Sequence, residues 1–255
     1  MKIGLLRWLG APSPYGRGHR LGVVWLRATD DARESDGDRP AYLDPSSDAG
    51  QDLRPLDPDL YDRLRRSAAR GETSVSALVE CGALPKGTVT FDQLLSFADL
   101  SPTERAKRTI RRERWFHEAM VAVASCSLVF VDSDNIPRDA DESLLSSHLR
   151  AEDDTSLSEM GRLLERGQSV VTHRRVGDSE AVAEHAESRM AEVYETLGAE
   201  PVVAVSGSGV STRLFTVIPH PGHRPDVQHR IGALQMSRWG DEFRVYRWRH
   251  EMTFV

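Results

Sequence analysis

Short apolar runs alternate with helix-like stretches along this 255-residue chain, and this order constrains its fold more than any other feature. The runs have strand length and are rich in Val, Leu, Ile and Phe, as strands covered on both faces are. Helix-length stretches separate most of them. The order predicts an α/β fold with a mostly parallel sheet and helices on both faces, and it also allows an antiparallel last pair at the edge. The strands are expected at residues 21–26, 74–81, 88–91, 127–132, 169–173, 201–205, 214–219 and 243–248.

The clearest helix signal is Ser101-Pro-Thr-Glu104, a capping box with proline at the first helical position. It predicts a helix that runs to about Ser125. Trp115 and Met120 in its second half are expected to be buried. The exposed basic face of this helix is expected to comprise Arg105, Arg108, Arg111 and Arg112.

Length and composition fit a single domain over residues 1–255, with 39% hydrophobic and 28% charged residues. A stretch at about 30–57, rich in Asp, Ser, Gly and Pro, predicts a long acidic loop. No apolar run approaches the ~18 residues that span a bilayer. The first ten residues lack the features of a signal peptide. We therefore expect a cytoplasmic protein without membrane contact.

An acidic strand end is the leading candidate site. The predicted strand 127–132 ends at Asp132, and Asp134 and Asn135 follow it. Ligands of open α/β sheets bind beyond the carboxyl ends of the strands. Two carboxylates and an amide there can hold a divalent metal, orient a water or accept hydrogen bonds from an amine. The alternative is that Asp132 caps a following helix and Asp134 is solvated.

Basic residues are the second group of candidates. His173 is expected at a strand end on the same rim, as a base or a ligand, with Arg174 and Arg175 beside it to clamp a phosphate. A histidine that is merely hydrogen-bonded at a strand end is the alternative. Two arginine-rich segments, one with Arg111 and Arg112 and one with Arg213, could contact nucleic acid. They could equally be ordinary surface cations of this arginine-rich chain.

The absence of several motifs narrows the function. The sequence has no G-x-x-x-x-G-K-[ST], G-x-G-x-x-G, G-x-S-x-G or H-E-x-x-H. ATPase, simple dehydrogenase, α/β-hydrolase and zincin activities therefore lose their main support.

A series of segments resembles an uncharacterised family of bacterial and phage proteins whose signature is a strand ending in Asp-Pro-Asp-Asn-Gly. The segments are Lys2-x-Gly-Leu-Leu-Arg-x-Leu9, Leu21-Gly-Val-Val-Trp25, Asp59-Leu-Tyr-Asp-x-Leu64, Phe130-Val-Asp-Ser-Asp-Asn135 and Arg166-Gly-Gln-Ser-Val-Val171. That family in turn distantly resembles Rossmann-type methyltransferases of nucleic-acid bases, in which a strand-end Asp-Pro-Pro-Tyr accepts the target amine.

This resemblance implies a Rossmann-like, methyltransferase-type fold and S-adenosylmethionine as a possible cofactor. Asp30 and Asp31, in the loop after the first strand, are the implied cofactor ligands, because a carboxylate suits a ribose hydroxyl. The sequence departs from the pattern twice. The stretch from Trp25 to Asp31 lacks the glycines of the methyltransferase loop, and Ser133 and Ile136 replace the proline and glycine of the strand-end signature.

Three functions remain open. The first is a methyltransferase-like enzyme acting on nucleic acid or a nucleotide-like substrate, with Asp132, Asp134 and Asn135 at the reacting group. The second is a hydrolase or nuclease in which Asp132 and Asp134, with Asp30 and Asp31, bind Mg²⁺ or Mn²⁺. The third is a non-catalytic binding module that has lost its cofactor site.

Overall fold

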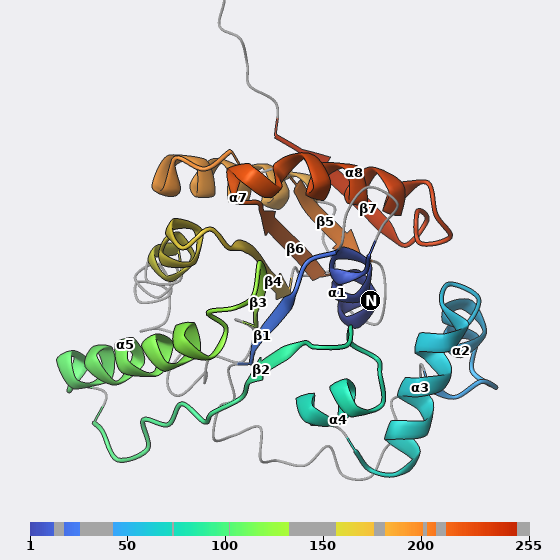
Figure 1. Cartoon of the computed structure of the whole chain (residues 1–255), viewed down its shortest axis with the longest axis horizontal. Helices are drawn as coiled ribbons and strands as arrows, with labels where there is room; N and C mark the ends of the chain where they lie inside the picture. The colour runs from blue at the N-terminus through green and yellow to red at the C-terminus, as the bar shows by residue number, and fades with distance from the viewer. Residues whose placement is uncertain are drawn as a thin grey trace, which may run out of the picture. The chain divides into compact units, whose positions relative to one another are not determined.

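The computed structural model describes residues 1–12, 18–25, 43–72, 74–101, 103–132, 157–175, 182–200, 203–207 and 213–248. The chain divides into two compact units, Met1–Ala140 and Asp141–Val255. The single domain stays a prediction. Both units contain strands and helices, which confirms the α/β class (Figure 1). None of the helices in the described part of the chain has the length and apolar character needed to span a bilayer.

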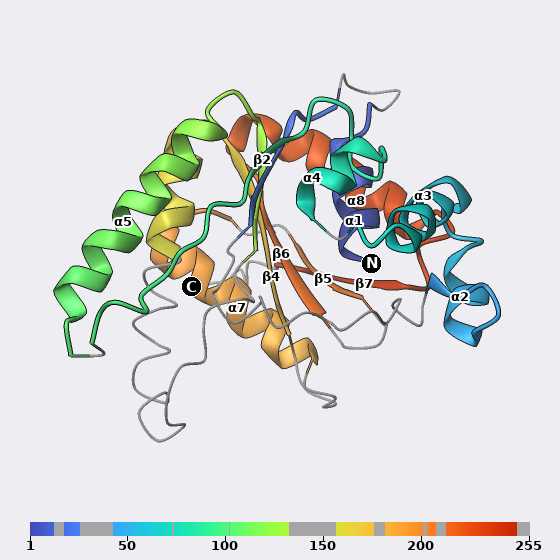
Figure 2. The same ribbon diagram turned by 90° about the horizontal axis from the view of Figure 1, so that it is seen from below.

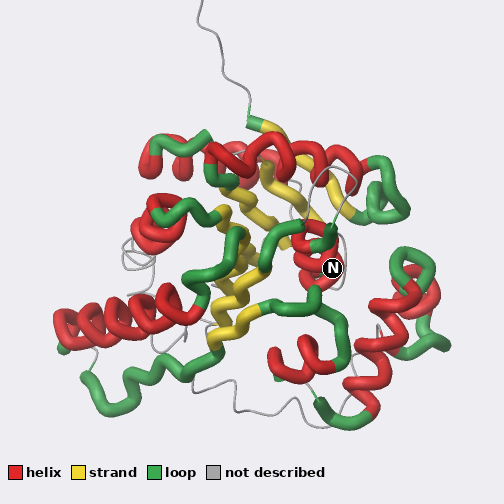
Figure 3. The backbone as a smooth tube through the Cα atoms, viewed as in Figure 1, coloured by secondary structure: helices red, strands yellow, loops and turns green. Residues whose placement is uncertain are grey.

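The first unit contains a parallel sheet with strand order β2-β1-β3. Gly22 of β1 is in register with Val89 of β2 and with Val129 of β3. Figure 3 shows these strands side by side. The elements of this unit are α1 (Lys2–Gly10), β1 (Leu21–Trp25), α2 (Asp48–Leu53), α3 (Pro58–Ala69), α4 (Val75–Glu80), β2 (Val89–Phe91), α5 (Arg105–Ala122) and β3 (Leu128–Asp132).

Helices α1 and α5 lie on opposite sides of this sheet (Figure 2). Side chains alternate between the two faces of a strand, so Gly22 and Trp25 point to opposite sides. A Cβ on Gly22 would lie 3.0 Å from the side chain of Val123, which follows α5 directly. The other face carries Trp25, Phe130 and Asp132, and Lys2 of α1 reaches it.

In the second unit the strands pair antiparallel in the order β4-β6-β5-β7. A mostly parallel sheet was expected, with an antiparallel pair allowed at the end of the chain, and the antiparallel pairing of β4, β6 and β5 was not expected. Residues 208–212 alone separate β5 from β6, and a parallel connection needs a crossover of a dozen or more residues. The elements are a helix over residues 157–165, β4 (Ser169–Arg175), α7 (Val182–Leu197), β5 (Val203–Gly207), β6 (Arg213–Ile218), a 3₁₀ turn (Pro221–His223), α8 (Arg224–Gln235) and β7 (Phe243–Arg247).

Three further predictions need correction. The stretch 74–81 is not a strand but the helix α4, because the Ser74 side chain accepts a hydrogen bond from the Ala77 N–H at 3.1 Å and caps it. The acidic loop at about 30–57 contains a helix, α2, capped by Ser47 in the same way. The helix expected from Ser101 begins at Arg105.

A charged network ties α1 to α3 and to the turn after α4. Asp59 accepts hydrogen bonds from Arg63, at 2.8 Å, and from Arg7. The same two arginines also donate to the carbonyl oxygens of Cys81 and Gly82. Hydrogen bonds from Arg63 and Arg7 lower the pKa of the Asp59 carboxyl to about 2, and the one from Arg63 has the larger effect.

We expect Asp59→Asn to remove a small, pH-dependent part of the stability. The folded-state pKa lies below the ordinary 3.8, so the ionised carboxylate stabilises the fold above that value. This contribution is lost as the pH falls through the range from 3.8 to about 2. Because Asp59 is half exposed, the loss at neutral pH should be at most about 1 kcal/mol.

Urea unfolding of both proteins across this pH range tests the expectation. The difference between wild type and Asp59→Asn should shrink as the pH falls. The exposed Glu113→Gln on α5 is the control and should show little difference throughout. A wild-type advantage over Asp59→Asn that persists unchanged at pH 2 contradicts the assignment.

Candidate functional site

Asp132 is the last residue of β3 and lies at the carboxyl edge of the parallel sheet, as predicted. In the parallel register it stands directly opposite Trp25, the last residue of β1. Only 1% of Asp132 is exposed, whereas Trp25 is half-buried. The two strand ends therefore place a buried carboxylate next to a partly accessible indole.

Lys2 completes this group. Its Nζ lies 2.9 Å from Asp132 Oδ2, 4.8 Å from the centre of the Trp25 ring and 5.5 Å from that of Phe130. Phe130 precedes Asp132 by two residues on β3 and thus shares its face of the sheet. We call Asp132, Trp25 and Phe130 the ammonium cage, because the carboxylate and both ring centres lie within 5.5 Å of Lys2 Nζ.

The chemistry of the cage follows from its burial. A carboxylate out of water needs a cation or several donors, and the Lys2 ammonium supplies the cation. The aromatic rings add cation–π attraction, which is stronger in a desolvated place. Lys2 is 16% exposed and pairs with Asp132, so we expect a ligand of the carboxylate to displace the Lys2 ammonium. The group can then accept a hydrogen bond from a donor and stack a planar ring on Trp25.

Four predicted site residues lie outside the described residues: Asp134, Asn135, Asp30 and Asp31. Their roles stay predictions. Within the described ranges, no group of three or more His, Cys, Asp or Glu side chains could hold a metal ion. What the described residues bring to Asp132 is an ammonium group and two aromatic rings.

His173 is not at a strand end as expected. It lies inside β4, which continues to Arg175 because Arg174 and Arg175 pair with Leu214 and Arg213 of β6. The imidazole is 98% buried, opposite Phe215, with ring centres 5.6 Å apart. This surrounding is typical of a core histidine. That His173 shares a rim with Asp132 stays a prediction.

The arginines expected to bind substrate differ in their surroundings. Arg111 donates to the Ser96 carbonyl oxygen at 2.9 Å and to both carboxylate oxygens of Asp99, whose pKa it lowers to about 2. It thus ties α5 to the preceding loop. Arg112 is half-buried. Arg213 lies opposite Arg175 at one end of the β4–β6 pair. Only the backbone of Arg175 is described there.

The other expectations for α5 hold in part. Trp115 and Met120 are buried, as predicted. Arg105 is exposed, but the Arg108 guanidinium lies 4.8 Å from the centre of the Phe97 ring. The basic face is therefore narrower than the sequence indicates.

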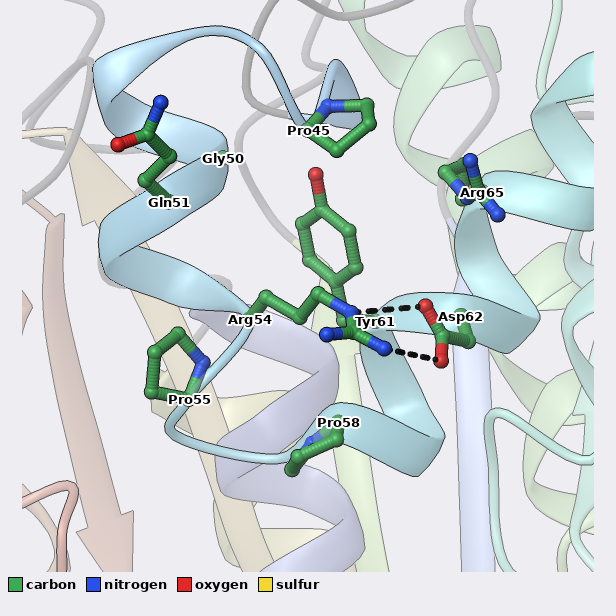
Figure 4. Close-up of a pocket in the computed structure, with 9 residues that line it drawn as sticks. All are labelled: Pro45, Gly50, Gln51, Arg54, Pro55, Pro58, Tyr61, Asp62 and Arg65. Atoms are coloured by element: carbon green, nitrogen blue, oxygen red, sulfur yellow. Dashed lines mark hydrogen bonds and ion pairs between the residues drawn. The ribbon is translucent and has the colours of Figure 1, made fainter.

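The first unit also has a surface pocket of about 480 Å³ between α2 and α3 (Figure 4). Pro45, Pro58 and the Tyr61 ring form apolar walls. Arg54 at its rim donates to both carboxylate oxygens of Asp62, at 3.2 and 3.1 Å.

Sequence reasoning missed this pocket, and it missed Lys2 as well. The leucines of α1 are a helix signal that could have placed Lys2 in a first helical turn.

No protein-family model matches this chain, and a search of the curated proteins gives no match to it. The resemblance described above stays a prediction.

Proposed function

We propose that this chain is a methyltransferase-like enzyme with a Rossmann-like fold that acts on a nucleic-acid base or a nucleotide-like substrate. The proposed site is the carboxyl edge of β1 and β3. One observation carries the proposal: the buried carboxylate of Asp132 stands beside the indole of Trp25 at the ends of two parallel strands. Ligands of open α/β sheets bind at such an edge.

Each residue has a chemical role in this proposal. Asp132 accepts a hydrogen bond from an exocyclic amine of the base. The Trp25 ring offers a stacking surface, and stacking on an aromatic ring contributes about 1–3 kcal/mol per base. Lys2 keeps the carboxylate paired until the substrate arrives, and then donates to an acceptor on the substrate or turns to water.

The described residues do not form a cradle for S-adenosylmethionine. Trp25 is the last described residue before 26–42, and the sequence from Trp25 to Asp31 contains no glycine. The place of this cofactor in the proposal rests on the resemblance alone. The proposal therefore concerns recognition of the substrate and takes no chemical step through the cofactor.

The geometry favours this function over the metal-dependent hydrolase. Divalent Mg²⁺ and Mn²⁺ are held by oxygen ligands, commonly from several carboxylates. The group that faces Asp132 Oδ2 at 2.9 Å is instead the Lys2 ammonium, whose positive charge would repel a metal ion.

A thermal-unfolding screen tests the proposal. The ligands are the common nucleosides and mononucleotides, S-adenosylmethionine, S-adenosylhomocysteine, Mg²⁺ and Mn²⁺. A ligand at 100 times its Kd should stabilise the fold by roughly 2.7 kcal/mol. We expect stabilisation by a nucleoside or nucleotide that bears an amine, and its loss in Asp132→Asn. Stabilisation by the metal ions alone would support the hydrolase, and no response to any of the ligands would contradict an enzyme of this class.

If the substrate is nucleic acid, the α5 arginines should contribute to affinity through phosphate contacts. We expect Arg105→Gln with Arg112→Gln to weaken binding at low salt and to reduce the slope of log K against log[salt]. The slope should fall by about 1.8 for duplex DNA or about 1.4 for single strands, if each arginine neutralises one phosphate. Arg70→Gln, directly after α3 and paired with Glu72, is the control and should leave the slope unchanged. An unchanged slope in the α5 variant would assign these arginines to the solvated surface.

A further inference from the structure

The ammonium cage has the composition of a site for an organic cation. Asp132 supplies the opposite charge at 2.9 Å from Lys2 Nζ, and two aromatic rings lie within 5.5 Å of the same atom. A ring attracts a cation that lies within about 6 Å of its centre, and ligands with an ammonium group are commonly bound this way.

The group that fills the cage is the ammonium at the end of the flexible Lys2 side chain. Lys2 is the first residue of α1. Its ammonium is attached to a flexible chain of four methylene groups, which can rotate to place the charge in solvent. The cage beneath it is rigid by comparison, because Phe130 and Asp132 belong to the buried strand β3 and are 0% and 1% exposed. We therefore expect Lys2 to move aside without the unfolding of a helix or strand.

We propose that the ammonium cage is a binding site for an organic ammonium ion and that Lys2 is its built-in occupant, which a ligand displaces. The ligand is a primary or methylated alkylammonium group, free or carried on a larger molecule. This inference goes beyond the proposed function, which requires only a neutral amine at Asp132. It also makes Lys2 a competitor that sets the affinity of the site.

Chemical rescue tests the cage. Lys2→Ala removes three methylene groups and the ammonium, a fragment that n-propylammonium chloride replaces. Stability of the variant is measured in propylammonium chloride, in sodium chloride of equal ionic strength and in 1-butanol, a neutral analogue of similar size. We expect a saturable rise in melting temperature with propylammonium and a binding constant at least about tenfold tighter than for 1-butanol. Wild type should show a much smaller rise, because Lys2 fills its cage.

A second variant separates the cage from a general salt effect. Lys2→Ala combined with Asp132→Asn also lacks the carboxylate charge that attracts an ammonium ion, and propylammonium should no longer stabilise it. If Lys2→Ala does not fold alone, it is refolded in each of the three additives. Recovery in propylammonium only supports the cage, whereas equal recovery in all three, or none in any, overturns it.

The outcome is independent of the nucleoside screen. Rescue without nucleoside binding would leave the cage and remove the proposed substrate. Nucleoside binding without rescue would leave the proposed function and make Lys2–Asp132 a structural ion pair.

Discussion

Lys2→Met is expected to lower the free energy of unfolding by about 3–5 kcal/mol, because it removes the ammonium that pairs with the buried carboxylate of Asp132. Methionine keeps much of the length and apolar contact of the lysine stem. The expected loss therefore comes mainly from the charge. Asp132 is 1% exposed and cannot turn to water, whereas Lys2, at 16%, is nearer the surface.

Urea unfolding of a matched pair measures this effect. Lys107→Met is the control, since Lys107 is also paired with a carboxylate, that of Glu104 at 2.6 Å, but is 67% exposed. It should cost at most about 0.5 kcal/mol. Adding Asp132→Asn to Lys2→Met should recover much of the loss, because the buried carboxylate charge is then removed together with the ammonium. Equal costs for the two lysine substitutions would show that burial of the Lys2–Asp132 pair has no energetic consequence.

Phe116→Ala is expected to destabilise the protein by about 3–5 kcal/mol. Phe116 is 1% exposed on the inner side of α5, so the substitution leaves a cavity in the core of the first unit. Ile110→Ala on the same helix is the control. Ile110 is 64% exposed, and its substitution should change stability by no more than about 0.5 kcal/mol.

The same urea measurements read out this pair. A loss below about 1 kcal/mol for Phe116→Ala, or equal losses at the two positions, would contradict the packing of α5 on the sheet.

The sequence predicted best where local pattern and tertiary packing agree. The buried run that ends at Asp132 is an example, because a parallel strand that is covered on both faces is apolar along its length. It failed at residues 74–81, where Val75, Ala77 and Val79 alternate as in a strand. Ser74 caps a short helix there, and the cap outweighs the alternation.

For the strands of the second unit, the predicted strand direction was wrong for a different reason. The residues between β5 and β6 are too few for a crossover, and this length alone indicates an antiparallel pair. The apolar runs alone do not show this antiparallel pairing. The end of β4 was expected at His173, two residues before its true end at Arg175. The polar Arg174 and Arg175 look like loop residues in the sequence, but both pair with β6.

The cage could not be predicted from local pattern. Lys2 and Asp132 are 130 residues apart in sequence, and no spacing rule connects them. Their contact depends on how α1 packs on the face of the sheet that bears Phe130. Trp25 could have been placed beside Asp132 only with the register of β1 and β3 in hand.

The central claim is that the edge formed by Asp132 and Trp25 binds a nucleotide-like ligand. Calorimetric titration of the best nucleoside from the screen into wild type, Asp132→Asn, Trp25→Leu and the exposed control Leu94→Ala tests it most directly. We predict that Trp25→Leu weakens binding by about 1–3 kcal/mol and Asp132→Asn by a similar amount, while Leu94→Ala binds as wild type does. Wild-type affinity in both site variants, with their folds intact, would contradict the claim.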